Sequence, residues 1–295
     1  MRLATWNVNS VRSRMPRLLP WLDARAPDVV CLQETKLPAE VFDELVRPAL
    51  AERGYAVAHH GDGRWNGVAI ASRVGLDDVV AGLLDEPVNP VGQLPGPEAR
   101  AVSATCAGLR VISVYVPNGR TPEDPHYQYK LDWLAALRAT VAAGTPAVSV
   151  VCGDMNVAPT DEDVYDAAAF VASTHVTPPE RDALRALGLH DLMRERWPTE
   201  RIFTYWDYRA GMFHQDRGMR IDLILAGADV APRTCAAWVD RQARKGTAPS
   251  DHAPVIVDFD DAPDGDCGPV VRRSGKATAP AVRRDQSSTF RRWPR

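Results

Sequence analysis

The stretch SVVCGDMNVAP, Ser149 to Pro159, decides the fold prediction, because an apolar strand ends there and immediately delivers two polar side chains. Ser149 to Cys152 is small or β-branched without interruption, a composition typical of a strand covered on both faces. Gly153 then frees the backbone. Asp154 and Asn156 lie two positions apart, and such residues point the same way on extended backbone. A carboxylate and an amide would then face one site, unless the stretch is only a polar turn after a strand.

Three stretches earlier in the chain repeat this pattern of an apolar strand that ends in polar side chains. They are RLATWNVN (2–9, with Asn7 and Asn9), PDVVCLQETK (27–36, with Glu34) and RVISVYVPNG (110–119, with Tyr115 and Asn118). Polar residues that follow buried strands lie at one edge of a sheet, which is where α/β proteins place their ligands.

Two further strands follow in the last third of the chain. In MRID, residues 219–222, the polar Arg220 and Asp222 alternate with apolar residues, which is typical of a strand with one face on a site. SDHAPVIVDF, residues 250–259, reverses the order, because its polar residues Asp251 and His252 precede the strand.

Two segments carry helical patterns of unequal strength. Residues 11–22 have apolar side chains at helical spacing, but Pro16 and Pro20 argue against a regular helix over the whole stretch. Residues 123–143 predict the clearest helix, with an apolar stripe of Tyr127, Leu131, Leu134, Leu137 and Val141. The β-rich segments on either side of that helix predict two sheets packed together.

Length and composition indicate an ordinary globular protein. The chain has 295 residues, with a hydrophobic content of 45% and a charged content of 25%. No apolar run approaches the roughly 18 residues of a membrane span, and the N-terminus lacks the apolar core of a secretory signal. We therefore expect a cytoplasmic protein that does not associate with membranes.

The cysteine and histidine pattern argues against zinc. The five cysteines are scattered and form no CxxC pair, so we expect buried thiols without a disulfide framework. His59 and His60 are adjacent and would face opposite ways on a strand, which predicts structural roles.

Charge divides the chain into an acidic body and a basic tail. The net charge is -3, but residues 262–295 contain eight Lys or Arg and three Asp, a net charge of +5, so residues 1–261 carry -8. The tail is also rich in Pro, Gly and Ser, which predicts a folded catalytic domain over 1–261 and a disordered arm over 262–295. Such an arm could contact nucleic acid or remain solvated without a partner.

Carboxylates, amides and one histidine at strand ends are typical of a hard-cation site that acts on a phosphate. Oxygen ligands favour Mg²⁺, with Mn²⁺ as a possible substitute. The cation would neutralise phosphoryl oxygens while a carboxylate or histidine activates water. The sequence contains neither a GxxxxGK[ST] phosphate loop nor a GxSxG nucleophile elbow.

The ordered motifs WNVN, LQETK, YVPNG, GDMN, MRID and SDHAP resemble the exonuclease III family of abasic-site DNA repair nucleases, within the larger endonuclease/exonuclease/phosphatase group. They span Trp6 to Pro254, nearly all of the chain before the tail. The resemblance implies a four-layered α/β sandwich, in which two packed β-sheets are flanked by helices and the site lies at one edge.

The resemblance also implies a role for each motif residue. Glu34 would ligate the metal together with Asn7 and Asp251, and Asp154 and Asn156 belong to the same set. Asp154 would orient or deprotonate water; Asn156 and His252 would hold the scissile phosphate; Asp222 would steady His252; and Tyr115 would lie near the leaving oxygen. Whether Asp154 or His252 is the base stays open. The predicted substrate contacts are Asn9, Asn118, Arg220, Tyr205, Met219 and Ile221.

The function that follows is Mg²⁺-dependent hydrolysis of phosphodiesters in duplex DNA, 5′ to abasic sites and at 3′ ends, by a monomer. Tyr205 and Met219 stand where family members often carry Trp or Phe, so the shape of the abasic pocket and the balance of activities stay open. A lipid phosphodiesterase of the larger group would need apolar membrane-facing loops, which are absent from the sequence. A DNA-binding protein without catalysis would lack one of the acids, and none is missing.

Overall fold

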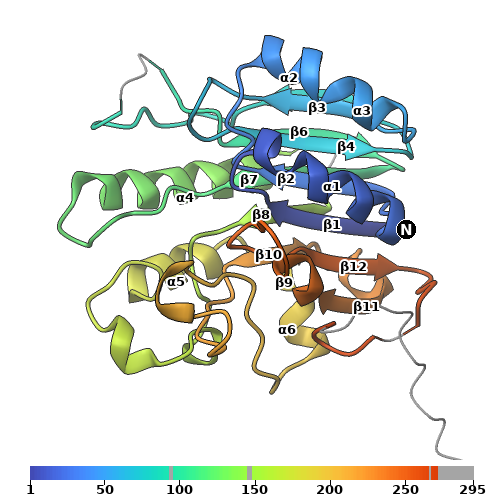
Figure 1. Cartoon of the computed structure of the whole chain (residues 1–295). Helices are drawn as coiled ribbons and strands as arrows, with labels where there is room; N and C mark the ends of the chain where they lie inside the picture. The colour runs from blue at the N-terminus through green and yellow to red at the C-terminus, as the bar shows by residue number, and fades with distance from the viewer. Residues whose placement is uncertain (93–95, 145–147, 266, 272–295) are drawn as a thin grey trace, which may run out of the picture.

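The computed structural model describes residues 1–92, 96–144, 148–265 and 267–271. Within these residues, two six-stranded sheets pack face to face and helices cover their outer sides (Figure 1). The predicted four-layered α/β sandwich is thereby confirmed.

The first sheet is built around a parallel pair from the N-terminal part of the chain. Strands β1 and β2 are parallel, and every other neighbouring pair in this sheet is antiparallel. In spatial order the strands are β11 (Thr234–Val239), β12 (Val255–Phe259), β1 (Arg2–Asn7), β2 (Val29–Gln33), β4 (Val68–Ser72) and β3 (Ala56–His60).

The second sheet repeats this plan. Strands β7 and β8 form its parallel pair, and the remaining neighbours are antiparallel. In spatial order the strands are β5 (Asp77–Ala81), β6 (Ala101–Cys106), β7 (Leu109–Tyr115), β8 (Val150–Asp154), β10 (Asp222–Ala226) and β9 (His190–Asp191).

Apolar side chains fill the three spaces between the four layers. One core cluster lies between the sheets, a second joins the first sheet to α1, α2 and α3, and a third joins the second sheet to α4 and α5. The helices are α1 (Val11–Arg25), α2 (Ala39–Leu45), α3 (Arg47–Ala51), α4 (Pro125–Ala143), α5 (Pro178–Arg185) and α6 (Leu192–Arg196). Short 3₁₀ turns occupy Asp161–Asp163, Ala167–Phe170, Arg209–Gly211, Ala231–Arg233 and Arg241–Arg244.

Helix α1 corrects the expectation drawn from its prolines. It runs without interruption through Pro16 and Pro20. Both prolines are exposed, so the carbonyl groups that lose a backbone donor can be hydrated. Leu18 and Leu22 are fully buried on the other face, and this packing holds the helix together.

Helix α4 confirms the predicted helix but only part of its apolar stripe. Leu134 and Leu137 are buried as expected, whereas Tyr127 and Leu131 are only half-buried. Trp133 is fully buried in their place. The buried face is therefore rotated from the predicted stripe and, as described below, includes a charged residue.

The folded part of the chain continues past the boundary predicted at residue 261. The backbone N–H of Val239 in β11 donates to Pro269 O at 2.9 Å, and the N–H of Val271 donates to Val239 O at 2.9 Å. The chain up to Val271 therefore packs on the body. The rest of the predicted tail, residues 272–295, lies outside the described residues.

The two adjacent histidines have separate structural contacts, as expected. His59 stacks on Phe42 with ring centres 3.8 Å apart, while Nδ1 of His60 bonds to Ala101 O at 3.0 Å. All five cysteines are free thiols; Cys31, Cys106 and Cys152 are buried, but Cys235 and Cys267 are partly exposed. None of the described helices combines the length and the apolar character that crossing a bilayer requires.

Candidate active site

Strand β8 brings Asp154 to the centre of one edge of the second sheet. Gly153 has a φ of 148° and lies so close to β7 that a Cβ there would meet Val114 O at 1.9 Å, so only glycine fits. The strand register then places Asp154 beside Tyr115 of β7 on one side and Asp222 of β10 on the other. Three predicted site residues thus become neighbours across three strands.

The first sheet contributes the facing edge of the site. Asn7 is the last residue of β1, and Glu34 directly follows β2. The Asn7 amide nitrogen donates to Glu34 Oε1 at 2.8 Å and to Asp154 Oδ2 at 2.9 Å. One amide therefore links carboxylates that come from different sheets.

His252 completes this group just before β12. Its Nδ1 bonds to Asp222 Oδ2 at 2.8 Å, and its Nε2 lies 3.8 Å from Asp154 Oδ2. The indole N–H of Trp6 donates to the His252 carbonyl at 3.1 Å and fixes the backbone. The imidazole is thereby held between two buried carboxylates, in the orientation that the sequence predicted for Asp222 and His252.

Burial and neighbouring charges set the protonation of the site. Burial raises the pKa of Asp154 to about 7, against the opposing effect of His252. Burial disfavours the charged imidazole, but Asp222 and Asp154 outweigh it and raise the pKa of His252 to about 10. Burial likewise works to raise the pKa of Glu34, yet Lys36 brings it below its ordinary value. At neutral pH the site holds a charged His252 beside an Asp154 that can take up a proton.

The donor atoms suit a hard divalent cation. Donor atoms of Glu34, Asp154 and His252 lie within 4.8 Å of one another. Asp222 Oδ1 is buried without a hydrogen-bond partner, so negative charge remains uncompensated beside this group. Carboxylate oxygens favour Mg²⁺ or Mn²⁺, and Glu34 and Asp154 fit as the carboxylate ligands.

Two residues predicted as metal ligands lie differently from the expectation. Asn7 turns its nitrogen toward the carboxylates, and its Oδ1 accepts the backbone N–H of Asn9 at 3.0 Å, so the amide positions the acids in this structure. Asp251 accepts from the Asn9 amide at 3.1 Å and is not part of the close group around Asp154.

The remaining predicted amides, Asn118 and Asn156, adjoin Asp154, whose Oδ1 accepts the backbone N–H of Asn156 at 3.0 Å. Asn118 Nδ2 donates to Asn156 Oδ1 at 3.3 Å, and Asn156 Nδ2 donates to a backbone carbonyl of Val116 at 2.9 Å. Behind them, the fully buried ammonium of Lys130 donates to Asn156 O at 2.6 Å and to Asn118 O at 3.2 Å. Glu180, also fully buried, pairs with Lys130.

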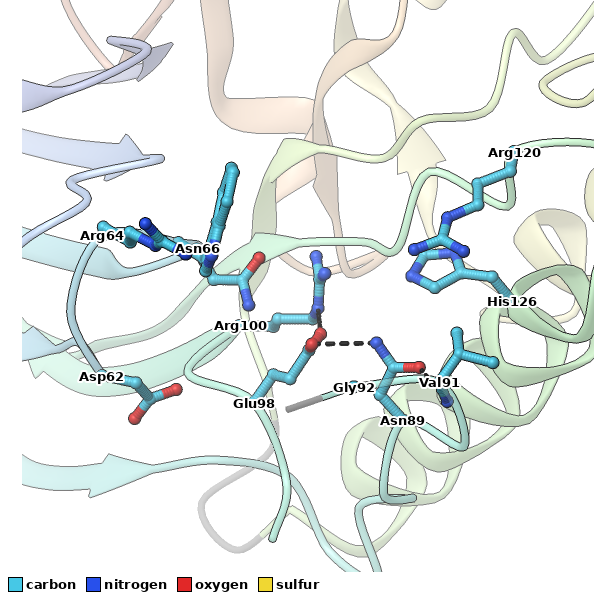
Figure 2. Close-up of a pocket in the computed structure, with 11 residues that line it drawn as sticks. Asp62, Arg64, Asn66, Asn89, Val91, Gly92, Glu98, Arg100, Arg120 and His126 are labelled. Carbon is cyan, nitrogen blue, oxygen red and sulfur yellow. Dashed lines mark hydrogen bonds and ion pairs between the residues drawn. The ribbon is translucent and has the colours of Figure 1, made fainter. Parts of the chain in front are cut away.

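Arg100 lines a pocket of about 410 Å³ and also contacts Tyr115. Figure 2 shows Arg100 held by Glu98, which in turn accepts a hydrogen bond from Asn89. The Arg100 guanidinium lies 4.9 Å from the Tyr115 ring and donates to the Tyr115 carbonyl at 3.2 Å. Burial, together with the nearby carboxylate of Glu34, raises the pKa of Tyr115 well above its ordinary value, so the phenol stays protonated.

An apolar cluster lies next to His252 and includes three residues predicted to line a sugar pocket. Met219 and Ile221 pack with Ala158 and Val164, and the partly buried Tyr205 joins them. The Tyr205 ring centre lies 4.9 Å from that of His252. The structure therefore brings Tyr205, Met219 and Ile221 together in a cluster beside His252.

Arg220 is the predicted substrate contact that the structure does not bring to the site. It is fully buried, and its guanidinium binds Asp163 at 2.7 Å and Asp191 at 2.7 Å. Strand β10 begins only at Asp222, so strand alternation does not extend back to Arg220. Arg220 is a structural residue, and the prediction that it contacts substrate is corrected.

Three residues at the site were not predicted from sequence. Lys36 belongs to the LQETK motif and pairs with Glu34 at 2.7 Å, so the motif carried the signal. Lys130 lies on the side of α4 that was expected to be apolar. His175 lies in a loop, and its Nδ1 bonds to Asn156 O at 2.5 Å. Nothing local marked Lys130 or His175, because their partners are distant in sequence.

These features define a class of protein. Carboxylates suited to a divalent cation, a charged imidazole and neighbouring amides are the parts of a metal-assisted hydrolase of phosphate esters. The chain belongs to the Endonuclease/Exonuclease/phosphatase family, whose sequence model matches residues 4–252. The family prediction is thereby confirmed.

Two individual relatives are similar to this chain over most of its length. DNA repair nuclease APEX1 of Danio rerio is 27% identical over 270 residues, covering 87% of this chain and 81% of the relative. Exodeoxyribonuclease III of Haemophilus influenzae is 28% identical over 273 residues, covering 88% of this chain and all (100%) of the relative.

Two solved structures are also similar to this chain over most of its length. The 3′ phosphatase NExo from Neisseria, bound to a product DNA hairpin, is 37% identical with a TM-score of 0.82, covering 88% of this chain and 99% of that chain. An AP endonuclease from Archaeoglobus fulgidus is 36% identical with a TM-score of 0.80, covering 88% of this chain and 100% of that chain.

Proposed function

We propose that this chain is a Mg²⁺-dependent nuclease that hydrolyses duplex DNA 5′ to abasic sites and trims nucleotides or phosphates from 3′ ends. The observation that carries the proposal is the group of Glu34, Asp154 and His252, whose donor atoms lie within 4.8 Å of one another. The relatives named as an AP endonuclease, an exodeoxyribonuclease III and a 3′ phosphatase support DNA as the substrate. A cytoplasmic monomer is part of the same proposal.

The chemistry proceeds by attack of water on phosphorus. A bound divalent cation supplies positive charge for the phosphoryl and leaving oxygens. Asp154 accepts a proton from the attacking water as the general base. As the new P–O bond forms, the bond to the 3′ oxygen of the preceding nucleotide breaks.

Positioned donors stabilise the charge that develops during this step. His252 is charged at neutral pH and, held by Asp222, donates through Nε2 to a phosphoryl oxygen. Asn156 contributes a neutral amide beside it. Tyr115 stays protonated and donates toward the leaving 3′ oxygen. The products are a free 3′ hydroxyl and a 5′ phosphate on the abasic residue.

Recognition of the abasic sugar is assigned to the apolar cluster beside His252. A sugar without a base fits a small cavity once it leaves the helix, whereas a normal nucleotide clashes or stays stacked. The Tyr205 ring lies 4.9 Å from the His252 ring, and Met219 and Ile221 pack in the same cluster, which supports this assignment.

The test compares duplexes that differ at one position. The purified chain is incubated with a duplex carrying one abasic analogue, the matched undamaged duplex and a duplex with a 3′ phosphate, each with Mg²⁺ or with chelator. We expect cleavage at the analogue and release of the 3′ phosphate only with Mg²⁺. Binding without cleavage would indicate an inactive DNA-binding protein, and hydrolysis of a sphingomyelin vesicle instead of DNA would indicate a lipid hydrolase.

A further inference from the structure

Two arginines, Arg14 and Arg244, contact Tyr208 beside the candidate active site, and Arg17 lies close to Arg14; we call these three residues the arginine cluster. Arg14 donates from Nη2 to the Tyr208 hydroxyl at 3.2 Å, and the Arg244 guanidinium lies 4.9 Å from the Tyr208 ring. Tyr208 is 50% exposed, so one side of the cluster faces solvent.

The arginine cluster lacks the acidic partners that buried arginines elsewhere in the fold have. Among the described residues, Arg14, Arg17 and Arg244 form no ion pair with Asp or Glu. Arg17 donates to backbone carbonyls such as Ala243 O at 2.9 Å, and Arg244 donates to Trp206 O at 3.3 Å. The Nε atom of each of the three is buried without a hydrogen-bond partner. Donors are therefore left unused beside uncompensated positive charge.

The three positive charges also repel one another. Burial lowers the pKa of Arg17, and the charge of Arg14 lowers it further. Burial and the charge of Arg14 likewise lower the pKa of Arg244, although Tyr208 and Asp251 act in the opposite direction. Repulsion of this kind is relieved when an anion binds between the guanidinium groups.

The arginine cluster is continuous with the active site. The Tyr208 hydroxyl donates to Pro249 O at 2.9 Å, two residues before Asp251. Asp251 is close enough to influence both Tyr208 and Arg244 electrostatically. Helix α1, which carries Arg14, begins directly after the loop of Asn9. An anion held here would thus lie beside the phosphate that is cleaved.

We propose that the arginine cluster binds a backbone phosphate of the substrate DNA strand, next to the scissile phosphate on the side of Asp251. This inference rests on the proposed nuclease function. Guanidinium groups match the geometry of phosphate oxygens. The body of the protein carries a net charge of -8 over residues 1–261, so a polyanion needs local patches of this kind to approach the acidic site.

The test removes one arginine from the protein and, separately, the charge of one phosphate from the DNA. Arg14→Gln is the main variant, because Arg14 is only half-buried and the change should be tolerated; Arg244→Gln is the second. Arg138→Gln on the exposed face of α4 is the matched control for loss of one charge. Binding of abasic duplex is measured with chelator over a range of salt, using oligonucleotides in which single phosphates are replaced by neutral methylphosphonates.

We expect Arg14→Gln to weaken binding about 10-fold at low salt and to reduce the slope of log affinity against log salt by about one. Cleavage at saturating DNA should stay at the wild-type rate. A methylphosphonate at the contacted position should weaken the wild type by a similar factor and leave Arg14→Gln unaffected. The control should resemble wild type throughout.

The proposal is overturned if Arg14→Gln and Arg244→Gln, shown to be folded by thermal melting, bind with the wild-type affinity and salt slope. It is also overturned if every methylphosphonate affects the variants as much as the wild type. Failure of the nuclease function looks different, since the wild-type protein itself would then not cleave the duplex.

Discussion

Two groups of buried charges lie near the start of β10 and differ in their balance. The Arg220 cluster contains two cations and two anions: Arg220, Arg194, Asp163 and Asp191. The Asp154 cluster contains three buried or half-buried carboxylates, Glu34, Asp154 and Asp222, against the cations His252 and Lys36, and Asp251 lies nearby.

The difference distinguishes buried charges that stabilise the fold from buried charges that are available for function. Ions that compensate one another inside a fold need no further partner, and removing one of them damages stability. An excess of one sign leaves a group that raises pKa values and attracts a counterion. We therefore expect changes in the Asp154 cluster to alter turnover and changes in the Arg220 cluster to alter stability.

Removal of the imidazole should reduce turnover more than the changes at Glu34, Lys130 and Arg220 described below. His252→Ala deletes the charge that Asp222 orients toward the phosphate, and loss of such a donor costs about 10²–10³ in kcat. Single-turnover cleavage of an abasic duplex measures it. A variant within a few-fold of the wild-type rate would remove His252 from the mechanism.

Neutralising Glu34 should act through the metal. Glu34→Gln removes one carboxylate from the group and should raise the Mg²⁺ concentration for half-maximal activity about 10-fold or more, with partial rescue by Mn²⁺. Stabilisation by Mg²⁺ in thermal melts gives a readout that does not depend on activity, and it should weaken in parallel. An unchanged Mg²⁺ requirement would show that Glu34 is not a ligand.

Loss of the buried ammonium behind the amides should have a moderate effect. Lys130 holds the carbonyls of Asn118 and Asn156, and removing it alone would leave Glu180 as an unpaired buried charge. The double variant Lys130→Met with Glu180→Gln avoids that cost, and we expect turnover to fall about 10-fold because the amides lose their fixed position. A folded double variant with wild-type turnover would limit Lys130 to a structural role.

Breaking the balanced cluster should have the smallest effect on turnover. Arg220→Met is expected to lower stability by about 3–5 kcal/mol while turnover of the folded protein changes little. Denaturant unfolding and single-turnover cleavage measure the two quantities. A large loss of turnover in folded Arg220→Met would show that Arg220 contributes to the active site.

The same variant should be more sensitive to acid. Burial acts to raise the pKa of Asp163, but Arg220 and Arg194 outweigh it and lower the pKa. A carboxylate with a lowered pKa stabilises the fold above its unfolded pKa of about 3.9, and this contribution is lost as pH falls through the folded pKa. Without Arg220 the folded pKa rises, so melting temperatures should begin to fall at a higher pH than in the wild type.

The sequence predicted those site residues whose positions are set by the ends of strands. Asn7 and Asp154 end apolar strands, Glu34 directly follows one and Asp222 begins one, and pairing of those strands brings them together whatever the details of the loops. The family resemblance added His252 and its orientation by Asp222. For these residues, local pattern and tertiary position agree.

Elsewhere the deciding contacts join distant parts of the chain. Arg220 fitted an alternating pattern, yet its partner Asp163 is 57 residues away and draws it into the interior. Lys130 is buried because Glu180, 50 residues away, pairs with it. Similarly, α1 passes through Pro16 because packing of its other face compensates the lost hydrogen bonds. Such pairings leave no local sequence signal.

The central claim is that Asp154 takes the proton of the attacking water in a metal-assisted cleavage of DNA. The direct measurement is single-turnover cleavage of an abasic duplex by Asp154→Asn at saturating Mg²⁺, with duplex affinity measured in parallel. Since the variant keeps the side-chain shape but loses the base, the rate should fall by about 10²–10⁴ while affinity stays within a few-fold. An unchanged rate, or a loss confined to affinity, would contradict the account.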